Sequence, residues 1–333
     1  MASYASGLSA VHTLFRIALV GLALALPVGG VAADPPAAAA AAANAPQEIL
    51  LETSDGVPIA AWYYPLPKDA ASIATVILVH DLDGSHRTVE PLAKALQAAG
   101  CAVVAPDLRG HGKSVLKSAP AGAAGEGQSK ALRKGDFEAM AASVGGRVRD
   151  QADMRGDLEC VFEWIRQQAA KNNLQMEPLV VVGSGVGGTL AARWAAADAA
   201  WPPLASGPQG RQVDGLVLVS PAFTSKGFTI QPALSPDLIG RAPPLLLLAG
   251  EDDRDSAKIF DQIKKHRPRG AFDGRKAVPA GADENDSPTL FLLQLPVKRS
   301  GDALASYRSA DPRQGDTATT ITGFLTKVVK ASP

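Results

Sequence analysis

The residues best suited to chemistry in this chain lie in a glycine-rich stretch near its middle. Apolar residues 179–182 are followed by Gly183, Ser184 and Gly185, and helix-forming residues continue beyond them. A continuous apolar run is typical of a buried parallel strand, and glycines allow a sharp reversal into a helix. A turn of this kind can hold a catalytic side chain or bind a phosphate group.

The spacing of Gly183, Gly185 and Gly188 also fits the dinucleotide-binding pattern G-x-G-x-x-G. That pattern belongs to the first strand–helix unit of its fold and needs an acidic residue about 20 positions further on. Asp198 comes too early, and two strands are predicted before the stretch. The sequence therefore favours a different strand–turn–helix element, and we expect no cofactor.

Two further segments carry polar side chains at the ends of predicted strands. Residues 106–114 read PDLRGHGKS, and residues 80–84 read HDLDG after a β-branched run. Together with the turn at 183–187, they resemble the α/β-hydrolase superfamily in its lysophospholipase-like, serine hydrolase branch. The resemblance covers residues 48–330 and implies a sandwich, with a mostly parallel sheet of about eight strands and helices on both faces.

In this family a nucleophilic serine stands at the centre of a G-x-S-x-G turn. The resemblance gives that position to Gly185, so the nucleophile is absent. The oxyanion loop of the family, H-G-x-x-G, corresponds to residues 80–84, where Asp81 replaces the first glycine. An aspartate beside a developing oxyanion repels it, which weakens the case for acyl transfer.

The other members of a Ser–His–acid triad are expected in loops after two late strands. The family's carboxylate corresponds to Asp253, with Asp252 and Asp255 as neighbouring substitutes, and its histidine corresponds to Asp302. Hydrolysis needs a nucleophile, a base and an orienting acid together. The resemblance therefore implies a degenerate triad in which only the acid is retained.

Other chemistries at this site remain open. Ser184 precedes the turn centre and could act as a displaced nucleophile if His80 or His86 reached it. The simpler explanation of Ser184 is a small residue in a crowded turn. His80, Asp81, Asp83 and His86 cluster in one loop, but the sequence offers no second group of metal ligands, so we expect no metal.

The two remaining histidines of the folded region are not expected to act as bases. His111 corresponds to a structural loop residue of the family, and His266 is predicted on a helix within a basic, solvated run. The amides of Val186 and Gly187 are expected at a helix N-terminus, which favours a carboxylate or phosphate group. With residues 80 and 81 they form the predicted ligand site, although the Asp81 charge opposes an anion.

Composition excludes some classes of partner. The 333 residues include 33 basic and 33 acidic side chains, and 46% are hydrophobic. This balance gives no electrostatic basis for binding nucleic acid or an anionic membrane. Cys101 on a predicted strand and Cys160 on a predicted helix are expected to be separately buried thiols.

The regular elements and the N-terminus complete the predicted organisation. Helices are predicted over about 88–99, 150–172 and 317–330 from apolar residues at helical spacing, and residues 115–150 form an irregular insertion. Residues 1–33 have the pattern of an export signal cleaved after Ala33. Its apolar run is shorter than the roughly 20 residues that span a bilayer, and an uncleaved anchor is the alternative. An alanine- and proline-rich linker over 34–47 precedes the domain at 48–333.

The sequence thus predicts an exported protein with the α/β-hydrolase fold that has lost catalysis. Its expected role is that of a binding or interaction module for an unknown small molecule or protein, with no transmembrane segment in the mature chain. The alternative is an active ester or acyl hydrolase with a non-standard site around Ser184.

Overall fold

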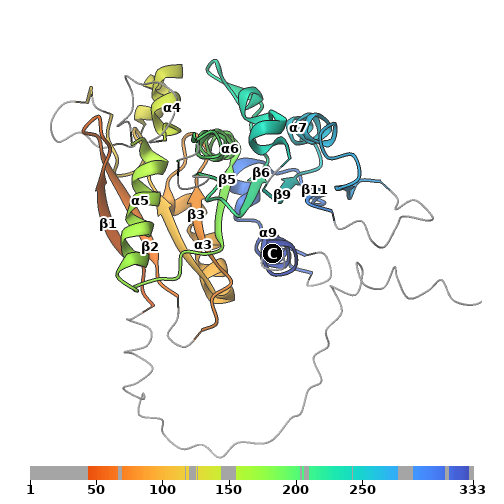
Figure 1. Ribbon diagram of the computed structural model, residues 1–333, viewed down its shortest axis with the longest axis horizontal. Helices are drawn as coiled ribbons and strands as arrows, with labels where there is room; N and C mark the ends of the chain where they lie inside the picture. Colours follow the sequence, from red (N-terminus) through yellow and green to blue (C-terminus); the bar gives the residue numbers. More distant parts are fainter. Residues whose placement is uncertain are drawn as a thin grey trace, which may run out of the picture.

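A nine-stranded sheet forms the centre of the computed structural model, in the order β1-β2-β4-β3-β5-β6-β9-β11-β10 (Figure 1). The first two strands are antiparallel to their neighbours, and the other seven are parallel. The sandwich predicted from the sequence is confirmed, with nine strands in the sheet rather than about eight. The strands are β1 (Gln47–Glu52), β2 (Pro58–Tyr64), β3 (Ala74–Val79), β4 (Cys101–Pro106), β5 (Leu179–Ser184), β6 (Gly215–Val219), β9 (Leu245–Ala249), β10 (Ala271–Asp273) and β11 (Leu290–Gln294).

The structure describes most of the chain after residue 43. The described residues are 44–66, 70–116, 118–119, 125, 127–143, 155–202, 205, 210–241, 243–276, 288–311 and 315–329. The expected signal at 1–33 and most of the expected linker lie outside these ranges. Among the helices within them, none is long and apolar enough to cross a membrane.

The central strands are buried because both of their faces carry apolar side chains. Every residue of β3, β4, β5, β6 and β9 is buried. Successive side chains of a strand point to opposite faces, so Val181 joins one core and Val180 and Val182 join the other. These short, continuous apolar runs explain why the sequence pattern identified the parallel strands.

Helices cover both faces of the sheet. Helices α5, α6 and α7 supply side chains to one core, while α3, α8 and α9 supply the other, and Figure 1 shows α6 and α7 on the opposite side of the strands from α9. The helices are α3 (His86–Ala99), α4 (Lys134–Met140), α5 (Asp157–Ala170), α6 (Gly185–Ala199), α7 (Arg254–Lys264), α8 (Gly301–Ala305) and α9 (Thr317–Phe324). The smaller elements are η2 (Gln128–Ala131), β7 (Thr224–Ser225), β8 (Phe228–Thr229), η4 (Gln231–Leu234), η5 (Pro236–Gly240) and η6 (Leu325–Val329).

Several predicted helix limits were wrong. The helix expected from residue 150 begins at Asp157, because Arg155 is not helical and Gly156 is the extended N-cap. The helix α7 ends at Lys264, so His266 lies in the turn beyond it. The apolar stripe correctly indicated the buried face of each helix. It did not show that α5 begins only after Gly156, or that α7 ends before the turn at Lys265 and His266.

The predicted irregular insertion contains ordered structure. Its described part includes η2 and α4, and Phe137 and Met140 of α4 are buried in the main core. The rings of Phe137 and Phe228 stack with their centroids 5.6 Å apart. Part of the insertion therefore belongs to the folded core, and the small apolar content of α4 concealed this in the sequence.

The two cysteines are free and buried, as predicted. Burial raises the pKa of the Cys101 thiol to about 11, and it raises that of Cys160 further. The thiolate is the reactive form of cysteine, so both side chains act as small apolar residues.

Candidate functional site

The glycine-rich turn has the geometry of a nucleophile elbow with glycine at its centre. Strand β5 ends at Ser184, and α6 begins at Gly185, whose φ is +52°. Side chains rarely adopt this left-handed conformation because of contact between Cβ and the backbone. The sharp turn expected from the sequence is therefore present. Glycine adopts its left-handed conformation without the strain that a residue with a Cβ would have.

The Asp81 carboxyl group occupies the place where an oxyanion would bind. In this fold the oxyanion donors are the amide after the nucleophile position and an amide in the loop after β3. The first is Val186 N–H and the second is Leu82 N–H. Both donate to the same oxygen, Oδ1 of Asp81, over 2.7 Å each. The carboxyl group of Asp81 is thus the hydrogen-bond acceptor for both of these amides.

Three glycines make room for this carboxyl group and its neighbour. A Cβ built at Gly185 or at Gly301 would overlap the Asp81 carboxyl group, and one at Gly84 would overlap the carboxyl group of Asp302. Gly301 has φ +52°, as Gly185 does. A serine at position 185 is therefore incompatible with Asp81 in its present position.

The environment of Asp81 makes its ionisation harder than usual. Burial raises the pKa of Asp81, and the negative charge of Asp302 raises it further. The hydrogen bonds from Val186 and Leu82 oppose this rise, because amide donors stabilise the carboxylate form. The net direction is upward, so the two amides only partly compensate for the loss of solvent.

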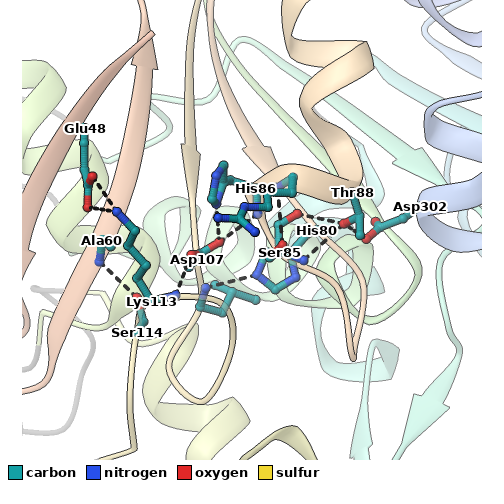
Figure 2. A network of polar contacts seen from close by, with 12 residues as sticks. Glu48, Ala60, His80, Ser85, His86, Thr88, Asp107, Lys113, Ser114 and Asp302 are labelled. Atoms are coloured by element: carbon teal, nitrogen blue, oxygen red, sulfur yellow. Dashed lines mark hydrogen bonds and ion pairs between the residues drawn. The ribbon is translucent and has the colours of Figure 1, made fainter. Parts of the chain in front are cut away.

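Asp302 lies in the same cluster, at the position where the sequence resemblance expected a histidine. It is on the short helix α8, and its Oδ1 accepts a hydrogen bond from Asp81 N over 2.8 Å. The hydroxyl groups of Ser184 and Thr88 also bind its carboxyl oxygens. Figure 2 shows Asp302 beside Thr88, at the N-terminal end of α3. Asp302 therefore connects α8, β5 and the loop after β3.

Ser184 lies beneath the turn. Its side chain is 1% exposed, and its hydroxyl group contacts Asp302 and the carbonyl oxygen of Val79, the latter at 3.4 Å. No hydrogen bond joins Ser184 to a histidine within the described residues. The partner of Ser184 is thus a carboxylate that also binds Thr88 and the Asp81 backbone.

The histidines near the site have structural partners. His80 Nδ1 donates to the carbonyl oxygen of Asp81 over 2.7 Å, and its Nε2 accepts from Leu108 N over 3.1 Å. His86 Nδ1 bonds Asp107 Oδ1 at 2.9 Å (Figure 2). These bonds hold the loops after β3 and β4 together.

His111 is buried beside His80, with ring centroids 4.9 Å apart. Burial lowers the pKa of His111 to about 4, so the ring is neutral near pH 7. Its Nδ1 bonds the carbonyl oxygen of Arg109 at 3.1 Å, and its Nε2 has no partner among the described residues. The ring fits the structural role that the sequence resemblance implied.

Asp253 lies at the start of α7, after β9, where the resemblance expected the triad carboxylate. Its oxygens accept hydrogen bonds from the hydroxyl groups of Ser220 and Ser256, each over 2.7 Å, and from Ser256 N over 2.9 Å. The neighbouring candidate Asp255 accepts from Phe223 N over 2.8 Å. Asp252 forms a distant, exposed ion pair with Lys298, at 3.9 Å. Asp253 therefore acts as a helix cap in this structure.

The predicted ligand site is altered by these contacts. Of the two amides expected to bind a ligand, that of Val186 is bonded to Asp81. Residue 187 lies close to the backbone of the loop after β3, since a Cβ built at Gly187 would overlap the carbonyl oxygen of His80.

The loop with His80, Asp81, Asp83 and His86 forms no metal-type cluster, since none exists among the described residues. A cavity of about 470 Å³ lies elsewhere, lined by Gln231, Pro232, Leu234, Ser235, Gln262, Lys265 and His266.

Sequence reasoning missed the residues that complete the site. Thr88 and Leu82 contact the two aspartates through a hydroxyl group and an amide, and neither stood out by residue type. Asp83 accepts a hydrogen bond from the Ser129 hydroxyl group, which brings η2 into contact with the loop after β3. The sequence did contain one indication of these contacts. Asp81 and Asp302 stand where the family has a glycine and a histidine, and Gly185 stands at the centre of the turn.

Comparisons with known proteins identify the family and the fold. Residues 70–258 match the Hydrolase_4 family model, described as serine aminopeptidase, S33. The chain is similar to an esterase of Pyrococcus furiosus, with a TM-score of 0.53 and 14% sequence identity over 91% of this chain and 100% of that one. It is also similar to carboxyl esterase 2 of the fungus Tuber melanosporum, with a TM-score of 0.50 and 13% identity over 86% of this chain and 87% of that one. No curated protein sequence matches it.

Proposed function

The chain belongs to the S33 serine aminopeptidase family of α/β-hydrolases, and from this premise we propose that it is an exported member that has lost catalysis. Its role in this proposal is that of a binding or interaction module, built on a hydrolase fold. The observation that carries the proposal is the position of Asp81, whose Oδ1 accepts hydrogen bonds from both oxyanion donors.

Each step of acyl transfer lacks a group that it needs. The turn centre is Gly185, so no side chain attacks, and the base position holds Asp302, which is already bonded to Ser184 and Thr88. A tetrahedral intermediate needs free donors for its oxyanion. At this site an acyl group would have to displace a carboxylate before its own oxygen could bind.

An active ester or acyl hydrolase around Ser184 is the second candidate. The hydrogen bond between Ser184 and Asp302 favours it, because a carboxylate can accept a proton from a hydroxyl nucleophile. Against it, Ser184 is buried and faces the end of β3 rather than solvent. The resemblance in fold to esterases supports both candidates equally, since a fold does not determine an activity.

The test is activity-based labelling of the mature protein with a fluorophosphonate probe, together with turnover of short-chain acyl esters. We expect neither labelling nor turnover in the wild type or in Ser184→Ala. Labelling of the wild type that disappears in Ser184→Ala would contradict the proposal and establish a displaced nucleophile.

A gain-of-function series provides the positive control. Asp81→Gly, Gly185→Ser and Asp302→His together free the oxyanion amides and add a nucleophile and a base, and we expect ester turnover above the wild-type background. The matched control carries Gly185→Ser and Asp302→His with Asp81 retained. Because Asp81 still competes for the same space, we expect it to remain inactive.

Export is tested separately. Expression of the full chain with its N-terminus intact should yield a mature protein whose mass corresponds to cleavage after Ala33. A membrane-bound product of full mass would instead support the anchored alternative.

A further inference from the structure

A buried carboxyl group outside the elbow joins three segments of the chain. Glu159 of α5 is 4% exposed. The Trp194 indole of α6 donates to its Oε2 over 2.8 Å, and the Ser143 side chain hydrogen-bonds the same carboxyl group. Ser143 Oγ also accepts from the Trp201 indole over 3.0 Å. A chain of hydrogen bonds therefore runs from the loop after α6, through Ser143, to Glu159.

The charges around Glu159 oppose its ionised form. Asp198 faces it from α6, and Glu163 lies one turn along its own helix. Arg166 acts on Glu159 from the same helix, but that guanidinium is bound to Glu163 at 2.9 Å. Within the described part of the chain, Glu159 forms no ion pair. Its negative charge would be held by two neutral donors, from Trp194 and Ser143.

These surroundings favour the protonated acid. Burial raises the pKa of Glu159 to about 7, with smaller contributions from the charges of Asp198 and Glu163. The hydrogen bonds from Trp194 and Ser143 act in the opposite direction without cancelling the effect of burial. A carboxyl group in this state changes its charge between mildly acidic and neutral pH.

We propose that Glu159 is a proton-controlled latch, which holds Ser143, just after α4, and Trp201, just after α6, against α5 and α6 and releases both when it ionises. The protonated acid keeps the chain of hydrogen bonds without burying a charge. The ionised form places an unpaired negative charge between two helices and beside Asp198, and opening of the latch restores its contact with water.

The latch acts on the cover of the elbow region. Ser143 follows α4, whose Phe137 stacks on Phe228, and the preceding η2 contacts the loop after β3 through Ser129 and Asp83. Ser143 is one of the attachments of this region to α5, and Gly156 N also donates to the carbonyl oxygen of Ala142 over 3.2 Å. Release at Ser143 therefore loosens one attachment of the region that contacts this loop, whether or not the site retains catalysis.

The sign of the pH dependence follows from the raised pKa. The folded, closed form binds the proton more tightly than an open form with an ordinary glutamate, so closure is favoured at low pH and weakens as pH rises toward 7. Between pH 5 and pH 7.5 we expect the opening equilibrium to increase on the order of 50-fold, with little further change above that range. The expected effect is thus confined to one pH window.

Two measurements on the full mature chain test the latch. In NMR spectra of protein with ¹⁵N-labelled tryptophan, the Trp194 indole N–H should titrate with a midpoint near 7, because it binds Glu159 directly. Hydrogen exchange at the Trp194 and Trp201 indoles should accelerate in the wild type relative to Glu159→Gln as pH rises from 5 to 7.5. The glutamine keeps an acceptor and a donor but cannot ionise.

Glu163→Gln is the matched control, because it removes a charge of the same sign from the same helix at a more exposed position. It should keep a rise of exchange with pH, with the midpoint shifted to lower pH because the Glu163 charge contributes to the raised pKa of Glu159. A Trp194 titration with its midpoint below 5 would overturn the latch, as would a constant ratio of exchange rates between the wild type and Glu159→Gln. Loss of the pH dependence in Glu163→Gln would assign it to the wrong residue and would overturn the proposal as well.

Discussion

A side-chain carbon at the elbow centre should displace the Asp81 carboxyl group. A Cβ at residue 185 overlaps that group, so Gly185→Ala forces it away from Leu82 N and Val186 N. Hydrogen bonds to a charged group contribute about 1.5–3 kcal/mol each, so about 3 kcal/mol or more is lost. The left-handed backbone adds about 1–2 kcal/mol. We expect Gly185→Ala to lower the free energy of unfolding by about 4–5 kcal/mol.

A double-mutant cycle isolates the contact between these two residues. Asp81→Ala leaves two amides without a charged acceptor and should cost about 2–6 kcal/mol, at about 1–3 kcal/mol for each amide. Once Asp81 is absent, Gly185→Ala should cost only the backbone strain of about 1–2 kcal/mol. The double variant should therefore be more stable than the sum of the single effects predicts, by about 3 kcal/mol.

Urea denaturation of the mature chain at pH 7, followed by tryptophan fluorescence, measures all four corners of the cycle. Gly227→Ala is the matched control for strain, because Gly227 has φ +79° and the nearest atom to a built Cβ is 3.9 Å away. It should cost about 1–2 kcal/mol. Additivity of the two variants within about 0.5 kcal/mol would refute the assignment of Asp81 to the space above Gly185.

Three further predictions concern buried groups away from the elbow. Asp157→Asn should lower stability by about 1.5–3 kcal/mol, because it removes one charged partner of the buried Arg109 guanidinium, at 2.7 Å, while the ion pair with Asp55 at 2.8 Å remains; urea denaturation measures this, and a loss below about 0.5 kcal/mol would contradict it. Burial raises the pKa of Asp107, but hydrogen bonds outweigh burial and hold that pKa below its usual value. The ionised carboxylate therefore stabilises the fold above about pH 4, and this contribution is lost as pH falls further. Asp107→Asn should flatten the acid limb of a profile of the free energy of unfolding against pH. Neither Cys101 nor Cys160 should react with iodoacetamide at pH 8 in the native protein, whereas both should react in urea; mass spectrometry measures the labelling.

The sheet was predictable because its strands carry local signals. Continuous apolar runs such as residues 179–182 and 245–248 identify buried parallel strands, and Asp55-Gly56 identifies the turn between β1 and β2. Helix limits were less predictable. An apolar stripe does not reveal that Gly156 is extended or that the chain leaves the helix after Lys264. The cleavage site and the linker stay predictions.

The sequence directed attention to residues that lie together in the structure, but it did not indicate their contacts. The sequence resemblance expected other residue types at Gly185, Asp81 and Asp302, and the structure brings all three together. The resemblance suggested that Asp81 would repel an anion at the elbow amides. It could not indicate that the Asp81 side chain itself accepts hydrogen bonds from these amides. That contact depends on the side-chain rotamer of Asp81, which fills space left by Gly185 and Gly301.

The altered positions form one interdependent set. Two buried amides that converge on one point need an acceptor when no substrate or water supplies it, and Asp81 Oδ1 is that acceptor. Its carboxyl group fits only because residues 185 and 301 lack Cβ atoms. A serine at 185 would collide with Asp81, while loss of Asp81 alone would leave the amides without a charged partner and the turn without a nucleophile. If the proposed loss of catalysis is correct, no single substitution restores an elbow with both a serine at its centre and free amide donors, because the Asp81 carboxyl group binds both amides.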